Sequence, residues 1–190
     1  MSRPRGLRVI AGSARGRRLV APEGDQVRPT KDIAREAMFS ALDARGALVD
    51  ATVLDLFAGT GALAIEALSR GAATAVVVER DRAALRSIRE NLGVLGDEVA
   101  VDVVARDVGR FLAGGPPADA FDLVFVDPPY STPDEEITEL LAQLTRPGWL
   151  APEAIVSVER PHRNPVVAPP GLSCGWERTF GDTLLTFLFI

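Results

Sequence analysis

The sequence predicts an α/β fold built around a mostly parallel β-sheet. From about residue 53 onward, short runs rich in β-branched residues alternate with helical stretches, a pattern typical of βαβ units. A glycine-rich turn directly follows the first of these runs. The C-terminal segment WERTFGDTLLTFLFI holds two β-rich runs around Gly181 and Asp182, which indicates an antiparallel hairpin at the end of the sheet.

The expected elements follow in chain order. Near the N-terminus, LRVIA and RRLVA flank GSARG and predict a small hairpin, and residues 30–44 carry apolar side chains at helical spacing. The core is expected to contain strands at 52–57, 74–79, 99–105, 121–127 and 154–159. Four helices are expected: one after the glycine turn that ends near residue 69, one over 84–92, a short one after Asp107 and one over 134–144. We therefore expect a basic hairpin arm over residues 1–29 and one domain over residues 30–190 that includes the N-terminal helix.

Charge is distributed unevenly along the chain. Residues 1–35 carry nine Lys and Arg against three acidic residues, a net charge of +6, so the total of −5 leaves −11 for the remainder. A basic arm on an acidic body is typical of proteins that contact a phosphate backbone. A solvated basic tail would have the same composition, and charge by itself does not separate the two.

Composition excludes several classes of protein. No apolar run reaches the ~18 residues of a membrane span and the N-terminus lacks a signal-peptide pattern, so we expect a soluble cytoplasmic protein without a membrane partner. The only cysteine, Cys174, can form no internal disulfide, and we expect it to be packed in the interior. The only histidine, His162, has no partners for a metal site. We expect no bound metal.

The glycine turn predicts a ligand that resembles a nucleotide. Gly59 and Gly61 let the backbone approach a ligand at the start of a helix, but with Ala64 they also match the dinucleotide pattern G-x-G-x-x-A. Asp55, near the end of the preceding strand, suits an ammonium group better than a pyrophosphate and favours S-adenosylmethionine. Glu79 ends the next strand and can accept ribose hydroxyls in either cofactor.

The most specific feature is Asp127-Pro-Pro-Tyr130 at the end of the strand FDLVFVD. Two prolines fix the backbone and donate no hydrogen bonds, so carbonyl groups are held beside a carboxylate and an aromatic ring. Hydrogen bonds from an exocyclic amino group of a base to Asp127 and the Pro128 carbonyl would localise the nitrogen lone pair for attack on a sulfonium methyl group. The Tyr130 ring would stack on the base.

The chain resembles the RsmD family of 16S ribosomal RNA guanine-N2 methyltransferases over nearly its full length. The segments RVIAGSARGRRL and RPTKDIAREAMFSAL are particular to that family, whereas the glycine turn and the Asp-Pro-Pro turn also occur in adenine-N6 methyltransferases. The resemblance implies a Rossmann-like class I methyltransferase sheet. It also implies chemistry at Asp127, Pro128, Pro129 and Tyr130, although the family often has Phe in place of Tyr130.

The resemblance further implies an S-adenosylmethionine site and a 16S ribosomal RNA substrate. We expect the protein to be a monomer and to act on this RNA within an assembling small subunit. For the cofactor we expect contacts from Asp55, Phe57, Ala58, Gly59, Thr60, Gly61, Glu79, Arg80, Asp107 and Val108, with Asp107 facing the adenine amino group. For RNA we expect contacts from Arg15, Arg17, Arg18, Arg28, Thr30, Lys31 and Arg35. Arg28 and Thr30 would alternatively close over the cofactor or fix the arm to the core.

Other functions remain open at this stage. An adenine-N6 methyltransferase poses the same chemical problem, but a DNA-specific enzyme would need a target-recognition domain for which the chain has no room. An NAD-dependent oxidoreductase would fit G-x-G-x-x-A but lacks a well-placed acid or base. A non-catalytic RNA-binding module would explain the arm and leave the Asp-Pro-Pro turn without a role.

Overall fold

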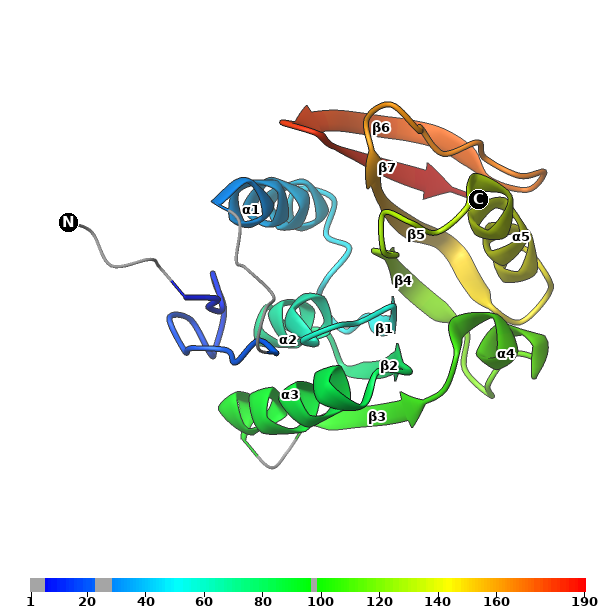
Figure 1. Ribbon diagram of the computed structural model, residues 1–190. Coiled ribbons are helices and arrows are strands. Elements are labelled where there is room, and N and C mark those ends of the chain that lie inside the picture. The colour runs from blue at the N-terminus through cyan, green and yellow to red at the C-terminus, as the bar shows by residue number, and fades with distance from the viewer. Residues whose placement is uncertain (1–5, 23–28, 97–98) are drawn as a thin grey trace.

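The computed structural model describes residues 6–22, 29–96 and 99–190. Figure 1 shows a twisted sheet with helices on both faces. The helices are α1 (Pro29–Asp43), α2 (Ala62–Ser69), α3 (Arg82–Leu92), α4 (Val108–Ala113) and α5 (Asp134–Leu144), with a 3-10 helix, η1 (Gly93–Leu95), after α3. The strands are β1 (Thr52–Leu56), β2 (Thr74–Glu79), β3 (Ala100–Ala105), β4 (Phe121–Val126), β5 (Leu150–Pro161), β6 (Ser173–Phe180) and β7 (Thr183–Phe189).

The sheet has the order β3-β2-β1-β4-β5-β7-β6. Strands β1 to β5 pair in parallel, and β7 pairs antiparallel with both β5 and β6. The order reverses between β1 and β4, and in an open α/β sheet ligands bind beyond the carboxyl ends of the strands at such a point. The predicted α/β fold with a C-terminal antiparallel hairpin is confirmed.

Alternating side chains divide the core into two layers. Val53 in β1 and Phe125 in β4 pack with α1, α2 and α3, whereas Leu54 and Val124 point the other way and pack with α4 and α5. This alternation with a period of two residues places hydrophobic side chains on both faces of the central strands, as a sheet covered on both sides requires. The carboxyl ends of β1, β2 and β4 are thereby held rigidly beside one another.

The N-terminal arm, defined here as residues 7–22, lies beside α2 and α3 (dark blue in Figure 1). The expected hairpin is reduced to one antiparallel bridge between Arg8 and Arg18. Regular strands do not form because several arm amides are directed at core side chains: Ile10 and Ala11 donate to Glu66, and Ala14 donates to the Ser69 hydroxyl. A short ladder remains, with backbone bonds from Val9 to Arg17 and from Leu19 to Leu7, while side-chain acceptors on α2 bind the amides of the connecting loop.

Some expectations about extent and burial were wrong. Strand β5 runs over Leu150–Pro161 and is longer than the predicted 154–159. Cys174 is exposed, not packed in the interior, because it lies in the outermost strand of the sheet, β6. No helix in the described ranges combines the length and apolar character needed to cross a membrane.

Candidate active site

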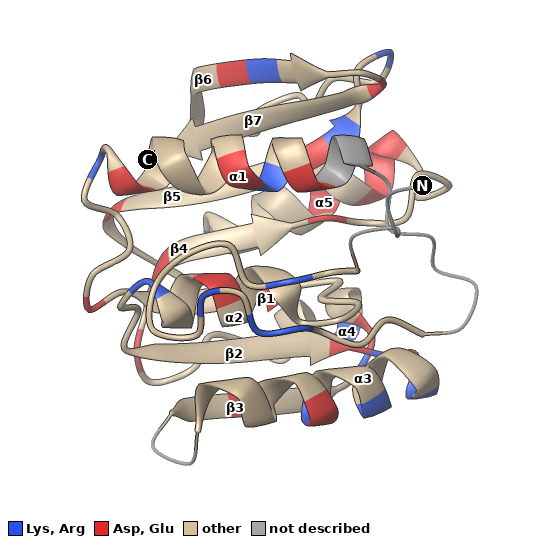
Figure 2. Ribbon diagram, turned by 90° about the vertical axis from the view of Figure 1, so that its left-hand side faces the viewer, with Lys and Arg blue, Asp and Glu red and all other residues tan. Residues whose placement is uncertain are grey.

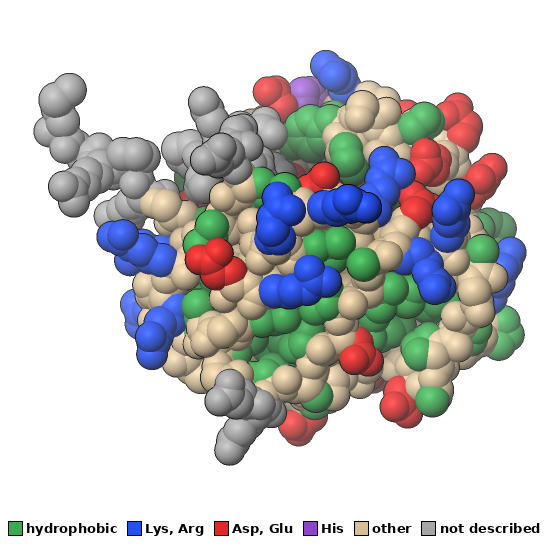
Figure 3. Space-filling view, turned by 60° about the horizontal axis from the view of Figure 1, so that its bottom comes forward, with side chains coloured by type: hydrophobic (Ala, Val, Ile, Leu, Met, Phe, Trp, Pro, Cys, Tyr) green, Lys and Arg blue, Asp and Glu red, His purple; other side chains and the backbone are tan. Residues whose placement is uncertain are grey.

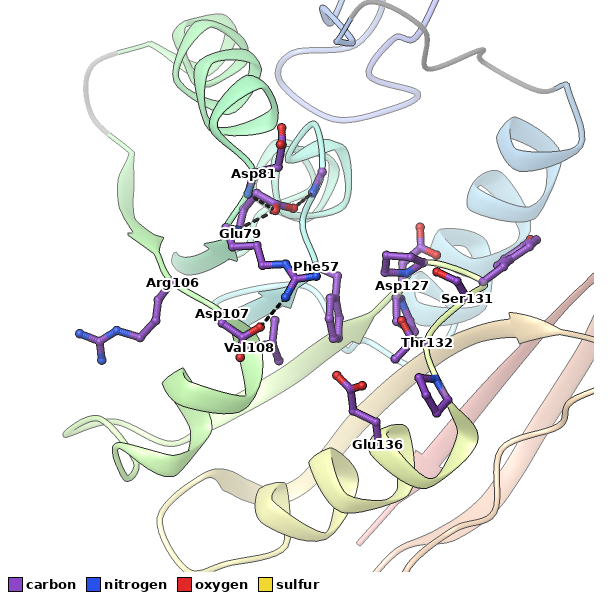
Figure 4. A pocket seen from close by; sticks show the side chains of 16 residues that line it. Phe57, Glu79, Asp81, Arg106, Asp107, Val108, Asp127, Ser131, Thr132 and Glu136 are labelled. Atoms are coloured by element: carbon purple, nitrogen blue, oxygen red, sulfur yellow. Dashed lines mark hydrogen bonds and ion pairs between the residues drawn. The ribbon is translucent and has the colours of Figure 1, made fainter.

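A cavity of about 820 Å³ lies at the carboxyl ends of β1, β2, β3 and β4. It is lined by the Asp-Pro-Pro-Tyr turn after β4, the acidic end of β2, parts of the glycine turn and the segment after β3. The lining residues are Phe57, Gly59, Glu79, Arg80, Asp81, Arg106, Asp107, Val108, Asp127, Pro128, Pro129, Tyr130, Ser131, Thr132, Pro133 and Glu136. Figure 4 shows Glu79 and Asp107 on one side of this space and Asp127 and Thr132 on the other.

The glycine turn has a backbone that only a few residue types tolerate. Gly59 and Gly61 have φ angles of 56° and 73°, and Phe57 has a φ of 59°, an uncommon value for a residue with a side chain. Gly59 lines the cavity, and a Cβ atom placed there would meet nothing closer than the Phe57 carbonyl at 3.9 Å. The turn therefore leaves room for a ligand to approach its backbone.

Glu79 is fixed in place by backbone amides. One of its carboxylate oxygens accepts from the N–H of Gly59 at 3.0 Å, and the other accepts from Arg80 and Asp81 at 2.6 and 2.7 Å. A carboxylate has about four acceptor positions, so these bonds orient the group and leave capacity for a hydroxyl donor. The end of β2 is thus joined to the glycine turn through one side chain.

Asp107 and Arg80 form an ion pair on the rim of the cavity. Arg80 Nη1 lies 2.9 Å from Asp107 Oδ2, and the other Asp107 oxygen accepts from the Arg110 N–H at the start of α4. Through this second bond Asp107 caps α4, the helix that the sequence analysis expected to follow it. Asp81, which the sequence analysis did not select for the site, caps α3 through Ala83 and Ala84 and also lines the cavity.

Asp55 lies beneath the glycine turn and does not line the cavity. It is 1% exposed, and its Oδ2 accepts from the Ala64 N–H at 3.1 Å in the first turn of α2. Gly61, the N-cap residue of α2, has no side chain for that purpose, so Asp55 caps the helix instead. Its Oδ1 is buried and makes no hydrogen bond.

Negative charge is concentrated at this point of the sheet. Burial raises the pKa of Asp55 to about 7, against the lowering effect of the Ala64 hydrogen bond, and the charges of Asp127 and Glu79 raise it further. Three carboxylates from β1, β2 and the end of β4 therefore repel one another electrostatically. Such an arrangement favours a cationic ligand over a pyrophosphate.

The Asp-Pro-Pro-Tyr turn is held from two sides. The Pro129 carbonyl accepts from the Thr132 N–H at 2.9 Å, and the Tyr130 hydroxyl lies 2.7 Å from the Thr183 hydroxyl in β7. Arg160 from β5, which is 3% exposed, donates to the Thr132 carbonyl at 3.0 Å and to Asp134. Arg160 was not selected from the sequence, because no local pattern marks a contact across 28 residues.

The cavity gathers some of the predicted cofactor residues and not others. The cavity is lined by Phe57, Gly59, Glu79, Arg80, Asp107 and Val108 together with Asp127 to Tyr130, whereas Asp55, Ala58, Thr60 and Gly61 are not among its lining residues. Sequence reasoning missed Arg106 and Glu136, whose side chains Figure 4 places at the edge of this space and on α5 below it. Neither residue belongs to a recognisable motif.

The residues predicted to contact RNA divide into exposed and buried groups. Arg15, Arg17 and Arg18 of the arm are exposed. Arg28 lies outside the described residues, and only the backbone helix position of Thr30 and Lys31 is described. Figure 2 shows the basic residues of the arm on the side that carries α2 and α3.

The expectation for Arg35 was wrong. Arg35 is 8% exposed, and its Nη2 donates to the Arg8 carbonyl at 2.7 Å and to Asp32 at 3.3 Å. Burial lowers its pKa, opposed by the nearby charges of Glu66 and Asp32. Arg35 therefore connects α1 to the arm inside the protein, where it is not available to RNA phosphates.

Exposed arginines also occur outside the arm. Arg82, Arg86 and Arg89 of α3 are exposed, as are Arg106 and Arg110 beside α4. Figure 3 shows arginine side chains in a band across the side of the molecule that carries α3, β3 and α4. This band was not anticipated, because its arginines are interspersed with acidic residues in the sequence.

The fold and the site together define a Rossmann-like α/β protein of the methyltransferase class. The chain belongs to the family described as conserved hypothetical protein 95, whose model matches residues 7–189. It is 42% identical over 165 residues to ribosomal RNA small subunit methyltransferase D of Escherichia coli, which covers 86% of this chain and 79% of that protein. It is 34% identical over 182 residues to the putative rRNA methyltransferase YlbH of Bacillus subtilis, covering 95% and 91% of the two chains.

Among solved structures, the fold is similar to that of the putative methyltransferase yhhF from Escherichia coli. The two superpose with a TM-score of 0.83 at 35% identity, over 96% of this chain and 97% of the other. The resemblance to the RsmD family that the sequence motifs indicated is confirmed by these comparisons.

Proposed function

We propose that this protein transfers a methyl group from S-adenosylmethionine to the exocyclic N2 of a guanine in 16S ribosomal RNA. The observation that carries the proposal is that Asp127-Pro-Pro-Tyr130 shares one cavity with Gly59, Glu79 and Asp107. A site for the target base and a site for a nucleotide-like cofactor on opposite sides of one cavity suit the transfer of a group from the cofactor to the base. The relatives named for ribosomal RNA methylation support the choice of substrate.

The residues present fit S-adenosylmethionine, which supplies an electrophilic methyl group on a sulfonium when it is bound. The unpartnered Oδ1 of Asp55 and the carboxylates around it favour the cationic amino-acid half. Glu79 is oriented to accept ribose hydroxyls, and Asp107 to accept from the adenine amino group. The remaining contacts would come from Phe57, Ala58, Gly59, Thr60, Gly61, Arg80 and Val108. Of these, Ala58, Thr60 and Gly61 do not line the cavity and would act by shaping the glycine turn.

Asp127 and the Pro128 carbonyl would accept hydrogen bonds from the guanine amino group. The Pro129 carbonyl is already engaged by the Thr132 N–H, which leaves the Pro128 carbonyl for the substrate. These acceptors localise the nitrogen lone pair, and the Tyr130 ring stacks on the base. Methylation leaves the nitrogen with one hydrogen fewer, and Asp127 is placed to pass that proton to water.

RNA would be bound mainly through phosphate contacts of the basic segment 1–29, which includes the N-terminal arm with its exposed Arg15, Arg17 and Arg18. Arg28, Thr30 and Lys31 extend the proposed contact toward the domain that begins at residue 30. We further propose that the protein acts in the cytoplasm, as a monomer, on an assembling small ribosomal subunit. Light scattering of the purified protein with and without particles would test the monomeric state.

The test is mass spectrometry of nucleosides after incubation with S-adenosylmethionine. Naked 16S ribosomal RNA and small-subunit particles from a strain that lacks the corresponding enzyme serve as substrates, and an Asp127→Ala variant serves as the control. The proposal predicts N2-methylguanosine with wild type and none with the variant. N6-methyladenosine would instead support the adenine-specific alternative, and no methylation of either substrate would contradict the proposal.

A further inference from the structure

Asn91 connects three segments that are far apart in the sequence. It lies near the end of α3 and is 1% exposed. Its Oδ1 accepts from the Val20 N–H at 2.6 Å, and its Nδ2 donates to the carbonyls of Val20 at 2.8 Å and Thr60 at 2.9 Å. The amide group of Asn91 therefore makes two hydrogen bonds to the arm, one as acceptor and one as donor, and donates one hydrogen bond to the glycine turn.

The bond to Thr60 acts on the turn that we assign to the cofactor. Thr60 lies between Gly59 and Gly61, both of which have left-handed backbone conformations that glycine readily adopts, so neighbouring contacts select this conformation among those open to glycine. A Cβ atom on Gly61 would lie 3.4 Å from Ile88, one helical turn before Asn91. Helix α3 thus presents a packing residue and a hydrogen-bond donor to the same turn.

The bonds to Val20 give the arm a direct connection to that turn. Other anchors of the arm, the Glu66 and Ser69 side chains, hydrogen-bond to residues 10, 11 and 14 and make no hydrogen bond to residues 58–61 within the described part of the chain. Among the described residues, Asn91 is the side chain that hydrogen-bonds to both, whereas Ile65 lies next to both through apolar packing. A buried amide with all of its partners present fixes the relative position of those partners.

We propose that Asn91 is a positioning residue that holds the cofactor turn in its binding conformation and couples it to docking of the N-terminal arm. This inference rests on the proposed assignment of the glycine turn to S-adenosylmethionine. Coupling between two sites is reciprocal, so arm docking strengthens cofactor binding by the same factor by which the cofactor strengthens docking. The RNA-contacting arm and the cofactor would then be bound cooperatively.

The first experiment is calorimetry with S-adenosylhomocysteine on wild type, Asn91→Ala and a matched control, Ser69→Ala. The control removes two bonds to the arm, to the Ala11 carbonyl and from the Ala14 N–H, and none to the turn. Asn91→Ala should weaken affinity by about 10-fold, the scale of one or two lost hydrogen bonds. Ser69→Ala should weaken affinity less than Asn91→Ala does, because it loosens the arm but leaves the Asn91 bond to Thr60 in place. Both variants should speed amide hydrogen exchange in the arm.

The second experiment needs no variant. S-adenosylhomocysteine should slow exchange of the Val20 amide in the wild-type protein, and unchanged exchange would overturn the coupling even if Asn91→Ala does not fold. Unchanged affinity in Asn91→Ala, or equal losses in both variants, would overturn the positioning role. A wild-type protein that binds no S-adenosylhomocysteine would instead contradict the proposed function.

Discussion

The hydroxyl groups of Tyr130 and Thr183 lie 2.7 Å apart, so a hydrogen bond connects the aromatic residue of the proposed catalytic turn to strand β7. The C-terminal hairpin therefore does more than complete the sheet. It determines where the ring that would stack on the target base is held. This bond separates two contributions of Tyr130, the ring and the hydroxyl, which substitution can test individually.

Tyr130→Phe should lower kcat/KM by no more than about 5-fold, because a net hydrogen bond contributes roughly 1 kcal/mol. Tyr130→Ala should cost a further ~1 to 3 kcal/mol, the scale of stacking between an aromatic side chain and a base. Thr183→Val is the matched control and should behave like Tyr130→Phe, with no additional loss in the double variant. Equal effects of Phe and Ala at position 130 would show that the ring does not contact the base.

Asp127→Ala should abolish methyl transfer and leave S-adenosylhomocysteine affinity within a few fold of wild type. The reason is that Asp127 lies on the wall opposite Glu79 and Asp107, where the target nitrogen and not the adenosine is expected (Figure 4). Activity is measured by tritium transfer to ribosomal RNA, and affinity by calorimetry. A large loss of cofactor affinity would assign Asp127 to the cofactor instead.

Glu79→Ala should weaken S-adenosylmethionine binding by ~1.5 to 3 kcal/mol, the scale of hydrogen bonds to a charged acceptor. The Glu79 side chain also accepts hydrogen bonds from three backbone N–H groups, one of them in the glycine turn. Part of the lost affinity will therefore come from a less well-held glycine turn. Glu79→Gln keeps the side-chain volume, but the amide cannot accept hydrogen bonds from all three N–H groups. This variant should therefore bind S-adenosylmethionine nearly as weakly as Glu79→Ala. Unchanged calorimetric affinity of both variants would refute the ribose role.

Local patterns predicted the strands and the two turns because their signals lie within a few residues. Gly59, Gly61 and Glu79 follow β-rich runs, and the parallel sheet then brings those run ends together. The burial of Arg35 could not be predicted, because its partner Arg8 is 27 residues away and the segment between them reads as exposed and basic. A buried arginine and a phosphate-binding arginine look alike in a sequence.

The same limit explains Asp55. Its position before the glycine turn predicts a cofactor contact, which stays a prediction, and its hydrogen bond to Ala64 depends on how α2 packs on β1. The anchoring of the arm by Glu66, Ser69 and Asn91 depends on contacts across 55 to 71 residues. Polar residues in helices carry no local signal that distinguishes such anchors from solvated positions.

Asp55→Asn should remove a pH dependence from folding stability. Burial raises the pKa of Asp55 from 3.8 to about 7, so the folded state holds a proton that the unfolded state has lost between these pH values. The free energy of unfolding contributed by this group therefore falls as pH rises through that range and is level above it. Asparagine mimics the protonated acid and does not titrate.

The measurement is urea denaturation of wild type and Asp55→Asn at several pH values between about 5 and 8. The difference between the two free energies isolates Asp55 from the other carboxylates. The variant should gain stability relative to wild type as pH rises toward neutrality. Parallel curves over this range would show that Asp55 has no raised pKa in the folded protein.

Changing Arg15, Arg17 and Arg18 to Ala should flatten the slope of log affinity for RNA against log salt by about two to three units, if each neutralises one phosphate. All three are exposed on the arm, while the rest of the chain after residue 35 carries a net charge of −11, from a total of −5 and +6 in residues 1–35. Affinity should fall almost uniformly across RNA sequences, because phosphate contacts position the substrate without reading it.

The matched control for this experiment is the change of Arg82, Arg86 and Arg89 to Ala, which removes the same charge from exposed positions on α3. We expect its salt slope to stay close to wild type, because those arginines lie outside the arm. S-adenosylhomocysteine affinity should be unchanged in both triple variants, since neither alters the Asn91 contacts with Val20 and Thr60. If the salt slope of RNA affinity is unaltered in the arm variant and flattened in the α3 variant, the phosphate contacts belong to α3 and not to the arm.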